Sequence, residues 1–239
     1  QVAAQDLAQV LHLAQVHGGR FPGGFSIAKS YHLSFFITYE NTGAVLGFVD
    51  TGQPTTREDA MGVKFSFKLN VHGQQPDTPF ERYLDLACHA EDTGFHGIYV
   101  IDHLLLPADR LVGITDADPA KPCFMDCWCT LAAVAARTKR VRIGPQVTPI
   151  GLRHPVFVAK WGATVDRISN GRLSLAVGLG HQEIEYVSHG FPYPGFKERY
   201  ARMMDGVEII RRLWTEPGPV TFEGQHYQVK DVNFWPKPV

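Results

Sequence analysis

From residue 61 onward, the chain alternates four times between a short apolar strand pattern and a longer helix pattern. The strand patterns lie at 63–71, 97–102, 141–149 and 172–180, and the helix patterns lie at 78–94, 124–137, 155–169 and 197–214. The strand pattern at 97–101 shows little alternation of apolar and polar residues, as expected of a strand that is covered on both faces. Repeated strand–helix units predict parallel strands that are joined by right-handed crossovers.

The helix patterns carry their own boundary signals. Pro79 and Pro155 are expected at the first helical positions, and Gly94 and Gly171 are expected to end those helices. In the helix at 155–169 the inward face is expected to comprise Val158, Trp161, Val165 and Ile168. A hairpin with its turn at Glu223–Gly224 is expected after the last helix.

Parallel strands of this kind can close in two ways, as an open doubly wound sheet or as a (β/α)8 barrel. The open sheet usually carries a glycine-rich phosphate-binding turn after its first strand. Here the first strand is followed by HGQQPDTP (72–79), which contains a single glycine. The sequence therefore favours an α/β fold of the (β/α)8 TIM-barrel type.

Residues 1–60 do not follow this alternation. A helix pattern at 3–19 ends in glycines, two strand patterns within 31–50 flank a turn at 40–43, and 51–60 has the composition of a linker. Because Met61 opens the first strand–helix unit, we divide the chain into 1–60, an extension of unknown role, and 61–239. The first part is either an unrelated appended segment or a genuine N-terminal extension.

Composition and motifs exclude several classes of function. The 239 residues carry a net charge of −1, and the longest basic run is RTKR (137–140), so nothing favours nucleic-acid or anionic-membrane binding. Apolar stretches are too short to span a membrane, and the first residues lack a signal-peptide pattern. Cys123, Cys127 and Cys129 have the spacing C-x3-C-x-C, which matches no zinc site, so we expect reduced thiols in a cytoplasmic protein without a metal.

The region 61–239 resembles the bacterial-luciferase-like family of flavin monooxygenases, which includes reductases and dehydrogenases that use a deazaflavin coenzyme. The motifs that carry the resemblance are GFHGIYVIDHL, RVRIGPQVTPIGLRHPVFVAKWGATVDRISNGRLSLAVGLGHQEIEY, GFPYPGFKERYARMMDGVEIIRRLW and VTFEGQHYQVKDVNFWPKPV. The resemblance implies a barrel, often dimeric, with a flavin across the carboxyl ends of the strands. A complete barrel needs about 250 residues, so we expect the first four strand–helix units plus an inserted hairpin, truncated at the C-terminus.

Asp102 and His103 follow the second strand directly, at the edge where barrel enzymes place their chemistry. A histidine titrates near neutrality and can move a proton to or from a substrate. From spacing alone, a histidine at the end of a strand is more often a surface or capping residue, and Asp102 could simply cap the following loop. The resemblance carries His103 onto the family's active-site histidine and Asp102 onto the acidic residue beside it, so both are candidate catalytic residues.

The ends of the third and fourth strands supply the candidate cofactor-binding residues. Gly144 and Pro145 interrupt the third strand, which indicates either an ordinary bulge or a close approach to a ligand. By resemblance, the residues that border the flavin are Gln146, Val147, Thr148, Gly178, Leu179, Gly180 and His181, with Glu185 and Tyr186 as the family's acid–aromatic pair. Many relatives have tryptophan at the position of His181, which leaves the subfamily open.

The function implied is a flavin- or deazaflavin-dependent oxidoreductase or monooxygenase, with hydride transfer or oxygen activation at the ring. Its cofactor would be FMN or coenzyme F420, its substrate a small molecule, and its partners a second copy of the chain and a separate flavin reductase. One alternative is a non-catalytic fragment or flavin-binding relative that lacks the phosphate-binding half. Another is an unrelated TIM-barrel enzyme. A half-barrel is also expected to leave its first and fourth strands as unpaired edges.

Overall fold

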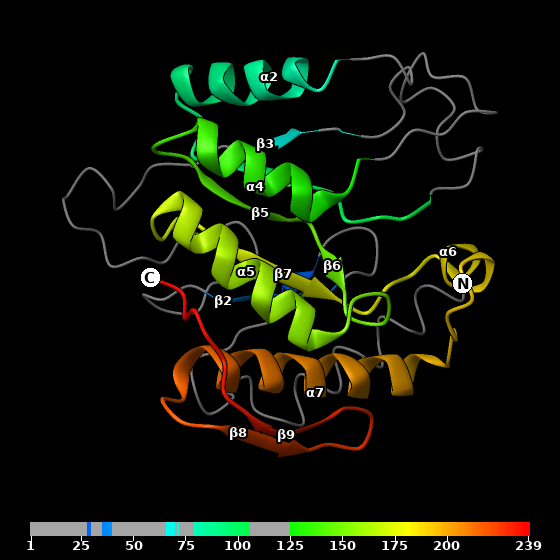
Figure 1. Cartoon of the computed structure of the whole chain (residues 1–239). Coiled ribbons are helices and arrows are strands. Elements are labelled where there is room, and N and C mark those ends of the chain that lie inside the picture. Colours follow the sequence, from blue (N-terminus) through cyan, green and yellow to red (C-terminus); the bar gives the residue numbers. More distant parts are fainter. Residues whose placement is uncertain (1–27, 30–34, 40–65, 70, 72–78, 106–124) are drawn as a thin grey trace.

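The computed structural model describes residues 28–29, 35–39, 66–69, 71, 79–105 and 125–239 (Figure 1). The predicted helix at 3–19, the turn at 40–43, the linker at 51–60, Cys123 and most of the loop after His103 lie outside these ranges. Among the described helices, none is both long and apolar enough to cross a membrane.

The strand–helix units form parallel strands in sequential order, as predicted. β3 (Ser66–Leu69), β4 (Gly97–Val100) and β5 (Arg142–Pro145) form one sheet, and β6 (Thr148–Pro149) pairs in parallel with β7 (Leu175–Gly178). The third predicted strand is thus divided into β5 and β6. A parallel bridge between Ile143 and Leu173 continues the strand order from β5 to β7.

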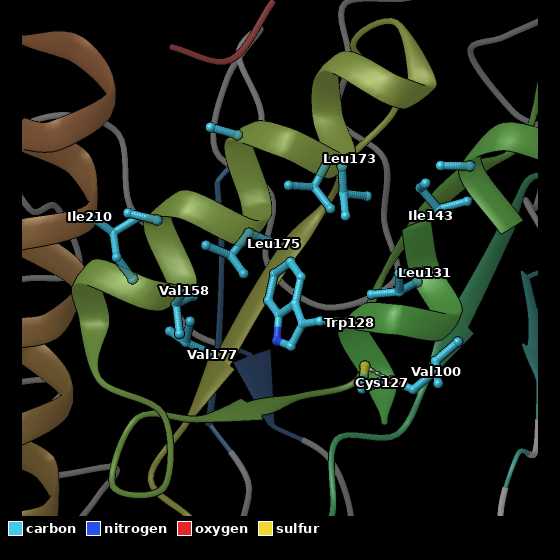
Figure 2. Packing of buried hydrophobic residues seen from close by; sticks show 14 of the residues in the cluster. Val100, Cys127, Trp128, Leu131, Ile143, Val158, Leu173, Leu175, Val177 and Ile210 are labelled. Carbon is cyan, nitrogen blue, oxygen red and sulfur yellow. Dashed lines mark hydrogen bonds between the residues drawn. The ribbon is translucent and has the colours of Figure 1, made fainter. Parts of the chain in front are cut away.

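In Figure 1, α4 (Cys127–Arg137) and α5 (Pro155–Ser169) lie in front of the strands, whereas α2 (Glu81–Asp92) lies above them and α7 (Phe196–Thr215) below them. The short α6 (Glu183–Ser188) lies at the right. Figure 2 shows how Trp128 and Leu131 of α4 pack with Leu175 of β7 and Val158 of α5. This continuous apolar core holds the carboxyl ends of β4, β6 and β7 at one edge.

Two details of the helix predictions were wrong. Pro79 is not the first helical residue, because Phe80 caps α2 and the helix begins at Glu81. Ile168 is not buried but 44% exposed. Helix α5 meets α7 through Gly162, where an added Cβ would lie 2.6 Å from the ring of Trp214, so its buried face is rotated away from Ile168.

The predicted helix ends are otherwise confirmed. Gly94 follows α2 with φ of +88°, and Asn170 and Gly171 both take left-handed conformations after α5, with φ of 59° and 81°. The hairpin also forms, from β8 (Val220–Glu223) and β9 (Gln228–Val232). Its turn lies at 224–227 rather than at Glu223–Gly224, because Glu223 still pairs with Gln228.

The expectation that the fourth strand has an unpaired edge was wrong. β2 (Phe35–Tyr39), one of the strands predicted within 31–50, pairs antiparallel with β7, and β1 (Ala28–Lys29) pairs with β2. The register places Ile37 opposite Val177. Local sequence patterns could not foresee this pairing because it joins segments that are far apart in the chain.

Candidate active site

The site lies where β4, β6 and β7 end, and side chains from three parts of the fold meet there. Asp102 and His103 follow β4, Thr148 lies in β6, and Glu185 lies in α6 just beyond β7. Parallel strands bring their carboxyl ends to one edge, so residues 82 positions apart such as His103 and Glu185 come into contact. The predicted residues fall into two separate networks.

The first network surrounds the carboxylate of Asp102, which is 2% exposed. Thr148 donates its hydroxyl to Oδ2 at 2.8 Å, and Arg153 donates from Nη2 to Oδ1 at 2.9 Å. The same guanidinium reaches Asp126, the N-cap of α4, at 3.2 Å. Burial raises the pKa of Asp102, and the charge and hydrogen bond of Arg153 offset part of that rise. Asp102 therefore faces inward and ties β4 to β6 and α5.

The second network joins His103 to Glu185. His103 Nδ1 lies 3.0 Å from Glu185 Oε2. The other oxygen, Oε1, accepts the backbone N–H of Leu104, and that of Leu105 at 3.3 Å. The Glu185 side chain is 2% exposed, whereas the His103 side chain is 15% exposed. The buried acid thus supports an imidazole that reaches the surface of the site.

A second imidazole lies at the same rim. The ring of His181 meets that of His103 edge-on, with ring centroids 5.7 Å apart. His181 Nε2 lies 3.1 Å from Gln182 Nε2, and the hydroxyl of Tyr193 donates to the His181 carbonyl at 3.3 Å. His181 is exposed. Tyr193 was not predicted from the sequence, because its contact depends on the fold of 187–195.

The glycines of this edge are explained by packing within the protein. A Cβ on Gly178 would lie 2.5 Å from Cγ2 of Val147, and a Cβ on Gly180 would lie 1.9 Å from the hydroxyl oxygen of Tyr186. Tyr186 donates that hydroxyl to the carbonyl of Leu179 at 3.2 Å, and burial raises its pKa. Flavin contact by these residues remains a prediction.

The predicted cofactor-binding residues differ in how far a ligand could reach them. Thr148, Gly178, Leu179, Glu185 and Tyr186 are buried, whereas Gln146, Val147 and Gly180 are half-buried and His181 is exposed. Val147 lies against Gly178, between the end of β5 and the start of β6. The half-buried residues at this edge are thus one polar side chain, one apolar side chain and one glycine. Ligand pockets commonly combine apolar lining with a few polar groups of this kind.

Arg153 and Asp126 belong to the site's framework although the sequence interpretation left them out. Arg153 immediately precedes the N-cap of α5, a position typical of architecture, and Asp126 caps α4 by accepting the N–H of Cys129 at 2.9 Å. A signal for Asp126 was present, since Asp before an apolar helix is a common N-cap. Nothing local connects it to Asp102.

The described residues offer no metal centre. In 79–105, 125–239 and the short strand segments, no group of three His, Cys, Asp or Glu side chains is arranged to hold an ion. Cys127 donates its thiol to the carbonyl of Val100 at 3.4 Å, and burial raises its pKa well above the usual value (Figure 2). Cys127 is therefore a packing residue of the core.

Comparison with known proteins gives consistent matches. The sequence model of luciferase-like monooxygenases matches residues 60–239. F420-dependent glucose-6-phosphate dehydrogenase of Amycolatopsis mediterranei is 36% identical over 156 residues, which are 65% of this chain and 44% of that enzyme. The enzyme of the same name from Segniliparus rotundus is 40% identical over 180 residues, 75% of this chain and 49% of that enzyme.

Solved structures agree with this result. An F420-dependent secondary alcohol dehydrogenase, in complex with an F420-acetone adduct, superposes on this chain with a TM-score of 0.62 at 24% sequence identity. The superposition covers 74% of this chain and 50% of the dehydrogenase chain. The chain thus spans about half the length of the relatives it matches. The predicted fold class, the first part of a (β/α)8 barrel, is confirmed.

Proposed function

The chain belongs to the luciferase-like monooxygenase family, and on that premise we propose that it forms part of a deazaflavin-dependent oxidoreductase. The relatives named as F420-dependent dehydrogenases support coenzyme F420 as the cofactor. The observation that carries the proposal is the imidazole of His103, which is 15% exposed and is supported by the buried carboxylate of Glu185. That pair can accept a proton at the edge where barrel enzymes bind substrate.

The residues present fit a flat ring with one polar edge. Gln146 and Val147 are half-buried at the interruption between β5 and β6, and Gly178 leaves the space that the Val147 side chain occupies. We propose that this surface holds the deazaflavin ring, with His103 and His181 beside it. When bound, the deazaflavin supplies the acceptor or donor of a hydride.

His103 supplies the proton chemistry in this proposal. When an alcohol is oxidised, a C–H bond breaks with hydride leaving, the O–H proton moves to a base, and a carbonyl forms. His103 Nε2 is the proposed base, because Nδ1 is engaged with Glu185. Leu104 and Leu105, which are half-buried, follow directly, and their backbone N–H groups bind the other oxygen of the same carboxylate.

Two other functions stay as alternatives. Oxygen activation with FMN is favoured by the name of the family, and a non-catalytic fragment is favoured by the match to only about half of each relative. A homodimer, a separate flavin reductase and a cytoplasmic location remain predictions of the sequence. The dehydrogenase proposal has priority because the more identical relatives carry that name.

The test uses the full-length gene product and its His103→Asn variant. We expect F420 to bind to both, as measured by fluorescence titration, and F420 reduction with glucose 6-phosphate or 2-propanol as probe substrates to fall about 100-fold or more in the variant. His89→Asn, at an exposed position of α2, is the matched control and should keep full activity. Binding of FMN but not F420, with oxygen consumption, would support oxygen activation instead. Failure to bind either cofactor would support the fragment.

A further inference from the structure

We propose that Glu185 is a positioning residue that keeps His103 in the Nδ1-protonated tautomer and so leaves Nε2 as the proton acceptor. The inference rests on the proposed function for its catalytic meaning. Its structural part concerns only the contact between α6 and the end of β4, and it can be tested without any cofactor.

The direction of each hydrogen bond at Glu185 follows from the donors around it. An ionised carboxylate can only accept hydrogen bonds. Oε1 takes the backbone N–H groups of Leu104 and Leu105, which can only donate. Oε2 lies 3.0 Å from His103 Nδ1, so this nitrogen must carry the hydrogen for a bond to form. In a neutral imidazole, the second nitrogen, Nε2, then has a free lone pair.

Packing holds the acid in place. Glu185 is 1% exposed, and the neighbouring Tyr186 is also 1% exposed and is bound through its hydroxyl to the carbonyl of Leu179. The same Tyr186 hydroxyl occupies the space above Gly180. The short helix α6 is thus fixed to the end of β7, and its carboxylate points to a single place, the segment 103–105.

The substitution Glu185→Gln should reverse the tautomer with little change in side-chain size. The amide oxygen of Gln must take the position of Oε1, because Leu104 and Leu105 can only donate to it. The amide NH2 then faces His103 Nδ1. Two donors cannot bond to each other, so Nδ1 becomes the acceptor and the proton moves to Nε2. The base would lose its lone pair although both side chains remain in place.

The experiment records long-range proton–nitrogen spectra of the full-length gene product labelled with 15N-histidine. The pH is raised until each imidazole carries a single proton, and His103 is assigned by the signal lost in His103→Asn. We expect the Nδ1-protonated pattern in the unsubstituted protein and the Nε2-protonated pattern in Glu185→Gln. Glu183→Gln, an exposed position on the same helix, is the matched control and should leave the pattern unchanged.

Activity gives a second readout. Glu185→Gln should bind F420 like the unsubstituted protein but reduce it about 100-fold more slowly, the usual contribution of a positioned base. An Nε2-protonated His103 in the unsubstituted protein would overturn the proposal, even if Glu185→Gln failed to fold. An unchanged tautomer in a folded Glu185→Gln would also overturn it. A reversed tautomer in a protein that binds no F420 would refute the proposed function and support the positioning role.

Discussion

The buried ion pair of Asp102 and Arg153 gives a prediction whose size can be worked out from the structure. The Asp102 side chain is 1% exposed and the Arg153 side chain 13% exposed, with 2.9 Å between Oδ1 and Nη2. Replacing Arg153 by methionine keeps much of the side-chain volume but leaves a buried carboxylate whose remaining partner is Thr148. Removing one member of a buried pair costs about 3–5 kcal/mol of unfolding free energy.

The cost of Arg153→Met should depend on pH in a definite direction. Burial already raises the pKa of Asp102, and Arg153 limits that rise. In the variant the pKa of Asp102 in the folded state rises further above its value in the unfolded state. At pH values between these two pKa values, the folded state binds more protons than the unfolded state. Stability then falls as pH rises through this window. We therefore expect a larger loss of stability at pH 8 than at pH 5, because the lower pH favours the neutral form of the carboxyl.

The assay is thermal unfolding followed by circular dichroism at both pH values. At 2–4 °C per kcal/mol for a chain of this size, the predicted cost lowers the midpoint by roughly 6–20 °C at pH 8. Arg137→Met is the matched control, because Arg137 is 44% exposed and its partner Glu81 is 61% exposed, and such surface pairs contribute about 0–1 kcal/mol. Equal effects of the two variants, or a cost of Arg153→Met that grows toward pH 5, would refute the reasoning.

Two more predictions concern stability. The Glu91 carboxylate is buried, which opposes ionisation, but backbone N–H groups of 139–141 at 2.6 to 3.0 Å lower its pKa. The contribution of this carboxylate to the free energy of unfolding is present above its unfolded pKa and is lost as pH falls through its folded pKa. Glu91→Gln should therefore cost about 1–3 kcal/mol of unfolding free energy near pH 7. Acid should also reduce the stability of this variant less than that of the unsubstituted protein. Gly180→Ala should lower the thermal midpoint more than Gly94→Ala. Both glycines have positive φ, but only a Cβ on Gly180 would meet Tyr186. An equal lowering of the midpoint by the two substitutions would contradict this prediction.

The fold was predictable where the sequence signals are local. Helix α5 has the predicted bounds because Pro155 fixes its start and a left-handed residue pair fixes its end. The long helix at 197–214 was within one residue of α7 at each end. The spacing of apolar residues wrongly predicted that Ile168 faces the core, because the face that a helix buries also depends on how closely the neighbouring helix can approach. Gly162 permits that approach to Trp214, and the contact spans distant parts of the sequence.

The site was predictable only in part. The position of His103 after a strand that emerges from the core made it a candidate, and the resemblance to the family was needed to select it. The identity of its partner was not, because Glu185 lies 82 residues further along the chain and was assigned to the cofactor by resemblance. Gly178 and Gly180 were predicted by resemblance to border the flavin, and in the fold the side chains of Val147 and Tyr186 already require a glycine at each position.

The two adjacent residues that first indicated a site have different roles for a simple geometric reason. Both residues follow β4, which ends at Val100, and their side chains take different directions. Asp102 turns inward to Arg153, a cation that keeps its proton, and forms a buried ion pair with it. His103 turns to the rim, where its Nδ1 meets Glu185. In the proposed function, Nδ1 holds a proton against this carboxylate and Nε2 exchanges a proton with the substrate. The different directions of the two side chains therefore favour His103 for the proposed acid–base chemistry and Asp102 for support of the barrel edge.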